Sequence, residues 1–374
     1  WQFPVETKYC VPPSEMTLAL ARVVRALSES SGQQISTHLL GLCAEISVDD
    51  YSVDIAKSIS SGKKCAVWLG NYAIQHKDAS LVHFLAQEIA RLSKSSLGIL
   101  GEAANSVGGY IAGAVPLGGI EGKNVVQMLS TPLKAYVLMN FEPELDLADG
   151  NVAVATLKKA EMVAVLSSFR SKSVLDFADV LLPVAPFAET AGVFVNCEGR
   201  AQAFYPVVKN LGESRPSWKV LRVIGSTLGL SGFDFDKIED VRSRIIENSN
   251  FIQQSLLNNE LSFNFDISFP VGYREGIERV ADIPIYSADM IVRRSTCLQE
   301  TVDENPVARM NSEMIRQLGL APGDFVRVKS AVGESKVNLI VDDEVANGCV
   351  RLAGAHPETA SLGALHCQIS VERV

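Results

Sequence analysis

Apolar runs and helical periods alternate along the first half of the chain, and this alternation limits the possible fold more than any other feature. The runs that suit buried strands lie at residues 65–69, 97–100, 135–139, 162–166 and 180–182. Amphipathic helical periods occupy residues 15–30, 51–60, 79–93, 123–129 and 151–159. Strands that alternate with helices of this length favour right-handed βαβ crossovers. We therefore expect an α/β fold with a mainly parallel sheet.

The pattern changes after about residue 230. One more helix is expected at 235–247, and residues 248–268 are rich in Asn, Ser and Gln without a period, which favours a connection. A short helix that ends in a turn is expected at 318–324. The β runs that follow lie at 324–330, 336–341 and 349–353. The expected parts are an α/β region over 1–235, a helix and connection over 236–282, and a β-rich domain over 283–374.

Composition narrows the classes of partner. The net charge of −9 argues against nucleic acid or an anionic membrane surface as the main partner. Since no window approaches about 18 uncharged apolar residues, we expect no membrane-spanning helix. The sequence begins at Trp1 without Met or a basic leader, so we expect a fragment of a longer polypeptide.

The seven cysteines lie far apart, the closest two being the pair Cys349 and Cys367. Iron–sulfur and structural zinc sites use local pairs such as C-x2-C, and this sequence has none. We therefore expect buried free thiols and no metal site. His366 and Cys367 are adjacent, but neighbouring side chains of a strand point to opposite faces, which argues against a shared metal.

The stretch 178–202 concentrates polar residues behind an apolar run. Asp179 precedes the run and Pro183 stops it, which suits the end of a buried strand. Residues 193–195 favour a second strand before an Asn-x-Glu-Gly-Arg turn. The spaced polar and glycine positions are Glu189, Gly192, Asn196, Glu198, Gly199, Arg200 and Gln202.

The pattern D-V-L-L-P-x5-E-x2-G-x3-N-x-E-G-R-x-Q resembles the molybdopterin oxidoreductase superfamily. The form N-C-E-G-R-A-Q is most similar to the family of the large iron–sulfur subunit of NADH:quinone oxidoreductase (respiratory complex I). The segment IPIYSADMIVRRSTCLQET, residues 283–301 with Asp289, Arg293 and Arg294, resembles the same family. The resemblance implies Rossmann-like layers of the formate dehydrogenase and DMSO reductase type. A carboxyl-terminal β-barrel of the molybdopterin-dinucleotide-binding, double-psi type would follow them.

In the molybdenum enzymes of this superfamily, strand-to-helix turns hold a pterin cofactor. The corresponding residues here are Gly70, Asn71, Asn105, Gly108, Asn140 and Pro143. The third turn departs from the G-x-N-P of active relatives, because Met139 precedes Asn140, and Phe141 and Glu142 precede Pro143. A phosphate would meet like charge at Glu142. We therefore expect degenerate turns that bind no cofactor, and no catalytic or metal-binding residue.

The polar residues of 178–202 have two interpretations. Asp179, Glu189, Glu198 and Arg200 could form an acid/base set, because paired carboxylates carry general acid/base catalysis when their pKa values differ. We favour a structural role, in which Arg200 forms an ion-pair network with Glu189 and Glu198 that fixes the hairpin. Gly192 and Gly199 would then supply turn conformations with positive φ.

The resemblance implies a scaffold without a redox centre of its own, not catalytic alone, within an enzyme that passes electrons from NADH through FMN and iron–sulfur clusters to quinone. The clusters would belong to a missing amino-terminal part and the FMN to a partner subunit. Expected partners are the NADH/FMN-binding subunit and its neighbours in the peripheral arm of complex I, on the cytoplasmic side of the bacterial inner membrane without insertion. The fragment itself is expected to be soluble. Two alternatives stay open: a degenerate or active formate-dehydrogenase-like molybdopterin oxidoreductase, and a nucleotide-binding domain.

Overall fold

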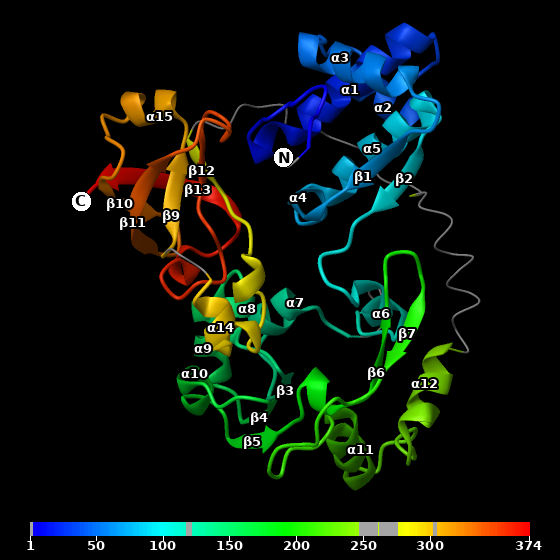
Figure 1. Ribbon diagram of the computed structural model, residues 1–374, viewed down its shortest axis with the longest axis vertical. Coiled ribbons are helices and arrows are strands. Elements are labelled where there is room, and N and C mark those ends of the chain that lie inside the picture. Colours follow the sequence, from blue (N-terminus) through cyan, green and yellow to red (C-terminus); the bar gives the residue numbers. More distant parts are fainter. Residues whose placement is uncertain (1–2, 117–121, 247–260, 262–275, 302–304) are drawn as a thin grey trace.

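The computed structural model describes residues 3–116, 122–246, 261, 276–301 and 305–374. Figure 1 shows an amino-terminal helical unit, an α/β layer, a hairpin with two following helices, and a carboxyl-terminal barrel. The strands of these parts form a two-stranded parallel sheet, a three-stranded parallel sheet, a two-stranded hairpin and a closed barrel.

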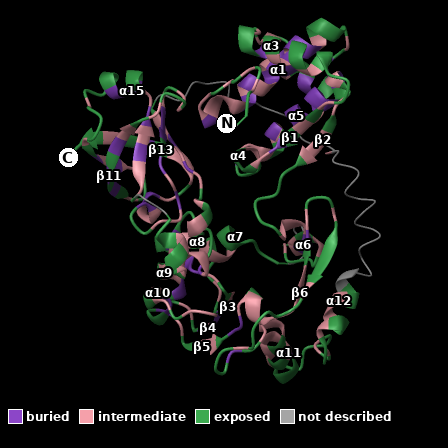
Figure 2. Ribbon diagram, in the orientation of Figure 1, coloured by how far each residue is buried: buried purple, intermediate pink, exposed green. Residues whose placement is uncertain are grey.

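The amino-terminal unit buries one face of a small sheet under helices. The sheet pairs β1 (Ala66–Leu69) with β2 (Ser96–Ile99). The helices are η1 (Pro13–Glu15), α1 (Met16–Ser31), α2 (Thr37–Cys43), α3 (Asp50–Ser61), α4 (Asn71–Ile74) and α5 (Ala79–Ser93). Leu27, Leu39 and Leu85 are fully buried between the helices, and Figure 2 shows buried positions gathered there. Asp49 and Ser52 form a reciprocal cap that starts α3.

The second part is a three-stranded parallel sheet in the order β3-β4-β5. Its strands are β3 (Ala135–Met139), β4 (Met162–Ser167) and β5 (Val180–Pro183). Its helices are α6 (Ser106–Ile111), α7 (Val125–Ser130), α8 (Pro143–Asp146), α9 (Gly150–Leu157) and α10 (Lys172–Leu175). After β5 the chain forms η2 (Phe187–Glu189), the hairpin strands β6 (Gly192–Val195) and β7 (Ala201–Phe204), then α11 (Ser217–Thr227) and α12 (Ile238–Ile246).

The carboxyl-terminal part is a closed six-strand barrel in the order β10-β11-β9-β12-β8-β13. Its strands are β8 (Ile277–Val280), β9 (Val307–Met310), β10 (Phe325–Lys329), β11 (Glu334–Val341), β12 (Cys349–Arg351) and β13 (His366–Arg373). The short helices are η3 (Ile285–Ser287), η4 (Val292–Arg294), α14 (Thr296–Gln299), α15 (Ser312–Gln317) and η5 (Ala360–Leu362). Side chains alternate along β11, so Val337 and Leu339 fill the interior.

The expected α/β fold with a carboxyl-terminal β-barrel is confirmed, with two local differences described below. No helix forms at 318–324. The helix before this stretch is α15, which starts where Asn311 accepts a hydrogen bond from the Met314 N–H at 2.8 Å and ends at Gln317. Strand β8 lies in the stretch expected to be a connection, because its charged residues hide the strand pattern. The connection expected at 248–268 lies outside the described residues, apart from Leu261.

Arg279 on β8 is a charged residue in the barrel interior, 1% exposed. Its guanidinium donates to the backbone carbonyls of Leu352 at 3.2 Å and Ala353 at 2.9 Å, and to those of Gly363 and Ala364. Burial lowers the pKa of Arg279 from its ordinary value. Within the described chain no carboxylate pairs with Arg279. Four backbone carbonyl oxygens therefore take the place of water around its guanidinium. Arg279 thereby fastens the segment 352–364 to β8.

We expect Arg279→Ala to destabilise the protein by roughly 3 kcal/mol or more, because several buried carbonyls lose a charged donor. The matched control is Arg351→Ala on the adjacent strand β12, whose ion pair with Asp282 at 3.0 Å is solvent-accessible. That change should cost under about 1 kcal/mol. Urea unfolding of both variants measures the difference, and equal midpoints would mean that Arg279 has no role in closing the barrel.

Candidate functional site

The hairpin β6–β7 and the second expected cofactor turn meet in the structure. Asn105, just before α6, accepts a hydrogen bond through Oδ1 from the Val195 N–H at 2.8 Å. Gly108 lies so close that a Cβ built on it would sit 2.0 Å from Asn105 Oδ1. A side chain at position 108 would therefore push Asn105 away from the hairpin. Both residues have a packing role that links α6 to β6.

Asn196 organises the hairpin turn. Its side-chain oxygen accepts from the N–H groups of Glu198 at 3.0 Å and Arg200 at 2.9 Å. Gly199 has φ of +77°, the left-handed conformation expected for it. Gly192 is needed for a different reason than expected. Its φ is not positive, but a Cβ there would lie 2.5 Å from the Phe204 ring.

The ion-pair network expected around Arg200 is wrong. The Arg200 side chain is exposed, and in the described part of the chain it pairs with neither Glu189 nor Glu198. Hydrogen bonds from backbone N–H groups to the Asn196 side chain already hold the turn. The hairpin therefore does not need the Arg200 guanidinium, which lies in solvent. Glu189 instead accepts from the Leu211 N–H at 3.0 Å and from the Ser214 hydroxyl at 3.3 Å.

The alternative interpretation, an acid/base set, is not assembled either. Asp179 accepts from the Val163 N–H at 2.7 Å and so joins β5 to β4. Glu189 fastens the segment that follows the hairpin, and Glu198 is exposed at the turn. Gln202 is exposed on β7, opposite Phe194. Each carboxylate thus has a separate structural partner or faces solvent.

Arg242 on α12 anchors the hairpin, and sequence patterns gave no sign of it. Its guanidinium donates to the carbonyls of Gly192 and Phe204, both at 3.1 Å, and lies 5.2 Å from the centre of the Tyr205 ring. The side chain is 11% exposed. A cation that binds the carbonyls of both strands holds the open end of the hairpin, the role that had been expected of Arg200.

The first turn begins a helix, and the third turn uses its polar residue internally. Gly70 precedes α4, where Asn71 is the first helical residue. Asn140 follows β3 in the left-handed conformation, with φ of +46°. Its side-chain oxygen accepts from the Ser168 N–H at 3.0 Å, which joins the ends of β3 and β4. Pro143 is buried as the first residue of α8.

The third turn carries a buried ion-pair cluster. Glu142 is 2% exposed and accepts from both Arg293 and Arg294, with the Arg293 contact at 3.1 Å. Arg293 also donates to Asp146 at 2.7 Å. The Arg294 guanidinium lies 5.0 Å from the centre of the Phe169 ring. The cluster joins the α/β part to the segment 283–301, which lies between the barrel strands β8 and β9 in the sequence.

The segment 283–301 is built to present these arginines. Asp289 accepts from the N–H groups of Ile291 at 2.7 Å and Val292 at 3.0 Å, and so starts the turn η4 that carries Arg293 and Arg294. Arg293 donates back to the Ser287 carbonyl at 2.9 Å. The motif of charged residues noticed in the sequence is therefore a structural unit whose partner is Glu142.

Two opposing effects set the protonation of Glu142. Burial alone would raise the pKa of its carboxyl, but the hydrogen bonds from Arg294 and Arg293 outweigh it, so the pKa lies below the ordinary value of 4.5. The same hydrogen bond raises the pKa of Arg294, because it also stabilises the charged form of the arginine. The cluster is charged at neutral pH. The negative charge of Glu142, which was expected to repel a phosphate, is neutralised by arginines of the same chain.

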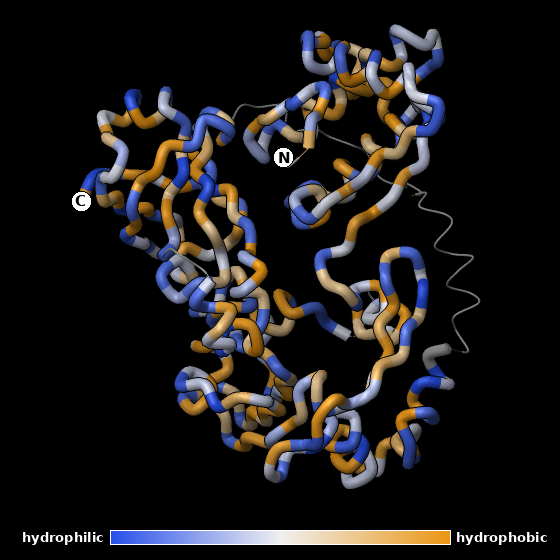
Figure 3. The backbone as a smooth tube through the Cα atoms, viewed as in Figure 1, coloured by the Kyte–Doolittle hydropathy of each residue, from blue (hydrophilic) through white to orange (hydrophobic). Residues whose placement is uncertain are grey.

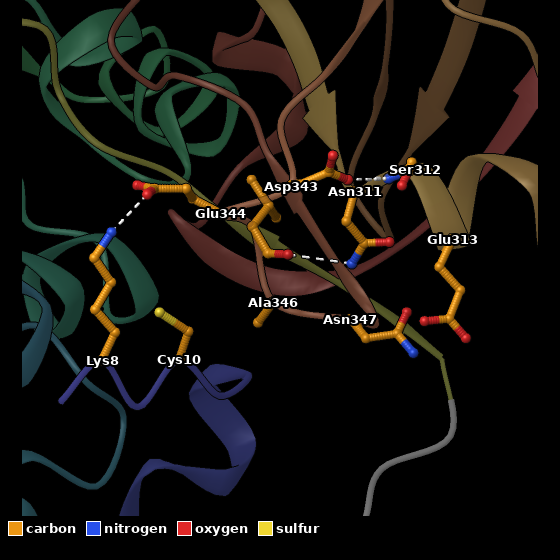
Figure 4. A pocket seen from close by; sticks show the side chains of 10 residues that line it. Lys8, Cys10, Asn311, Ser312, Glu313, Asp343, Glu344, Ala346 and Asn347 are labelled. Carbon is orange, nitrogen blue, oxygen red and sulfur yellow. Dashed lines mark hydrogen bonds and ion pairs between the residues drawn. The ribbon is translucent and has the colours of Figure 1, made fainter. Parts of the chain in front are cut away.

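A pocket of ≈ 540 Å³ lies between the amino-terminal segment and the barrel (Figure 4). Lys8 pairs with Glu344 at 2.6 Å across it, and Asp343 accepts from the Ser312 N–H at 2.8 Å. Asn311 donates to the Val345 carbonyl at 3.1 Å. These groups satisfy one another at a solvent-open surface and form no catalytic arrangement.

No group of three or more His, Cys, Asp and Glu side chains among the described residues is suited to hold a metal ion. The cysteines are unpaired, and the expectation that they are buried holds for Cys43 and Cys349 only. Burial raises the pKa of Cys43 to about 11 and that of Cys349 to about 12, so these thiols are unreactive. Cys10, Cys197 and Cys297 are exposed. In the described part of the chain no helix has the length and apolar character needed to cross a membrane.

Two family models match this sequence. Residues 42–227 match the molybdopterin oxidoreductase model, and residues 285–369 match the molybdopterin dinucleotide binding domain. The chain belongs to the molybdopterin oxidoreductase family. The second match coincides with most of the closed barrel, and its name indicates molybdopterin as the cofactor of this family.

Two curated relatives of this chain are distant from it in sequence. It is 23% identical over 281 residues to F420-dependent formate dehydrogenase 2 subunit alpha of Methanococcus maripaludis, covering 63% of this chain and 40% of that protein. A putative formate dehydrogenase of Bacillus subtilis is 23% identical over 270 residues, covering 62% of this chain and 27% of the relative. The chain thus spans less than half the length of these relatives. The solved structure of acetylene hydratase from Pelobacter acetylenicus has the same fold, with a TM-score of 0.67 at 14% identity, covering 96% of this chain and 70% of that one.

The residues at the third turn do not fit the family's cofactor. The carboxylate of Glu142 is buried under two arginines, so neither it nor they can bind a phosphate while the cluster holds. The bulky Met139 and Phe141 flank this position. At the second turn Asn105 is committed to the hairpin backbone. These groups hold the protein together.

We expect Glu142→Gln to destabilise the protein by about 3 kcal/mol at pH 7, because the largely buried Arg293 and the partly exposed Arg294 lose their charged partner. A lowered pKa in the folded protein means that the stabilisation is present above the ordinary value of 4.5 and is lost as the pH falls through the lowered pKa. The difference between variant and wild type in urea unfolding should therefore shrink on acidification. The matched control is Glu161→Gln, whose pair with Lys134 is exposed and should contribute under about 1 kcal/mol.

The two hairpin arginines provide a second test. Arg200→Ala should change the free energy of unfolding by under about 1 kcal/mol, because its side chain is solvated. Arg242→Ala should cost about 2 kcal/mol, because two carbonyls at the open end of the hairpin lose a charged donor. Urea unfolding distinguishes them. A larger loss for Arg200→Ala than for Arg242→Ala would reverse the assignment.

Proposed function

We propose that this chain is the scaffold part of the large iron–sulfur subunit of an NADH:quinone oxidoreductase, in which the molybdopterin fold holds no cofactor. The observation that supports it is the cluster of Glu142 with Arg293 and Arg294. The cluster joins the altered third turn to the segment 283–301. The acid of the turn and the arginines of the segment each need the other as a partner. A turn that serves as an internal brace suits a subunit that supports redox centres held elsewhere.

The scaffold would position neighbouring polypeptides of the electron-input arm. The iron–sulfur clusters would belong to an amino-terminal part of the same subunit, and the FMN to a partner subunit. The exposed cysteines are single and lie on separate elements, which does not suit a cluster. This chain would contribute geometry and stability, and the electron transfer would take place outside it.

A second candidate is a formate-dehydrogenase-like molybdopterin oxidoreductase, and the comparisons favour it over the first. Relatives from Methanococcus maripaludis and Bacillus subtilis are named as formate dehydrogenases, the second with the qualification "putative". In that case the chain would be part of a subunit that takes up a molybdopterin dinucleotide. The cofactor would then have to bind without the third turn in its present form, because Glu142 and its arginines fill that position.

Tagging the chain in its native host separates the two candidates. If the first candidate is right, the complex purified with the tagged chain should reduce ferricyanide with NADH. It should not reduce a dye with formate. Elemental analysis should find no molybdenum above the level of the same preparation from molybdate-depleted cells. Formate-dependent activity together with stoichiometric molybdenum would favour the second candidate and exclude the first.

A further inference from the structure

The connection between β11 and β12 ends in the dipeptide Asn347-Gly348. Asn347 is exposed, and Figure 4 shows its side chain beside the pocket. The Cys349 N–H donates to the Ala346 carbonyl at 3.2 Å, so residues 346–349 form a tight turn. Gly348 has φ of +77°, a conformation that suits glycine. Figure 3 colours this connection largely as hydrophilic, in agreement with its place at the surface.

The Asn347 side chain faces the backbone nitrogen that follows it. Its Oδ1 accepts from the Gly348 N–H at 3.1 Å. Within the described part of the chain no second hydrogen bond restrains this amide. A Cβ built on Gly348 would have no other atom within 4 Å, so the space around the nitrogen is open. The side-chain carbonyl carbon and the next backbone nitrogen can therefore approach each other.

Asn311, which lines the same pocket, is a comparison within the chain. It also precedes a small residue, Ser312, but its side chain is held at both ends. Its Oδ1 accepts from the Met314 N–H at 2.8 Å, and its Nδ2 donates to the Val345 carbonyl at 3.1 Å. The Ser312 N–H donates to Asp343 at 2.8 Å. These bonds keep the Asn311 amide away from the nitrogen that follows it.

We propose that Asn347 is a deamidation site of the folded protein. The Gly348 nitrogen gives its proton to solvent and forms a bond to Cγ of Asn347. The bond between Cγ and Nδ2 breaks, and the amide takes up a proton and leaves as ammonia. Water then opens the cyclic imide at either carbonyl, which leaves aspartate or isoaspartate at position 347. Asparagine is a thermolabile residue, and the glycine makes the attack easier because it has no side chain to shield its nitrogen.

The two products affect the barrel differently. Aspartate adds a negative charge at an exposed turn and keeps the course of the backbone. Isoaspartate runs the backbone through the side-chain carbon, which lengthens the turn. The Gly348 carbonyl accepts from the Glu278 N–H at 2.8 Å, where β12 pairs with β8. A longer turn displaces this carbonyl, so the isoaspartyl form closes the barrel less well.

The test is peptide mapping by mass spectrometry after the purified chain is incubated at neutral and at alkaline pH. The peptide that contains Asn347 should gain an oxygen in place of an NH group, and faster at alkaline pH, because the attacking nitrogen must first lose its proton. Its rate should exceed that of Asn311 by about tenfold or more, because only Asn347 can reach the attacking nitrogen. Equal rates at the two asparagines, or conversion of Asn347 only in urea-unfolded chain, would overturn the proposal.

Two variants separate the attacking nitrogen from the amide. Gly348→Ala should slow the reaction by about tenfold, because a methyl group shields the nitrogen. Since alanine is strained at this φ, Asn347→Gln is the second variant, which keeps the glycine and should abolish the reaction because a larger ring would have to close. An unchanged rate in either variant would contradict the mechanism.

The product forms test the effect on the barrel. The isoaspartyl form, separated by ion exchange, should unfold at a lower urea concentration than the Asn347→Asp variant, which has the same charge and the ordinary backbone. Equal midpoints would show that the turn absorbs the longer backbone, against the proposed effect on β8 and β12.

Discussion

The carboxylate of Glu142 connects the two halves of this protein. It leaves water completely, which is favourable only because Arg293 and Arg294 reach it from a segment about 150 positions further along the sequence. The α/β part supplies the acid and the carboxyl-terminal part supplies the bases, so the buried charge of Glu142 is satisfied only when the two parts meet. The relative position of the sheet and the barrel therefore depends on this small electrostatic centre.

The same centre explains how a cofactor fold can exist with altered turns. The turns of this family lie where strands end, and their polar groups must bond to something. In this chain Asn105 binds the hairpin, Asn140 binds the neighbouring strand end, and Glu142 binds arginines. Each internal partner substitutes for a ligand as a source of hydrogen bonds.

Sequence patterns were sufficient for the fold where periodicity is strong. The helix over 79–93 and the strand over 135–139 coincide with α5 and β3, because apolar spacing and burial agree there. Strand β8 escaped prediction because Arg279 points into the barrel, against the usual link between charge and exposure. The roles of Arg200 and Arg242 were not predictable either. Which arginine reaches a set of carbonyls depends on how α12 packs against the hairpin, and local spacing does not contain that information.

The closed barrel also determines when this part of the chain can finish folding during synthesis. Strand β13 pairs with both β8 and β10, so the ring can close only after residues 366–373 have left the ribosome. Until then two strands expose unpaired edges, which are prone to pair with other nascent chains. The emergence of β13 thus decides when the barrel strands are protected from aggregation.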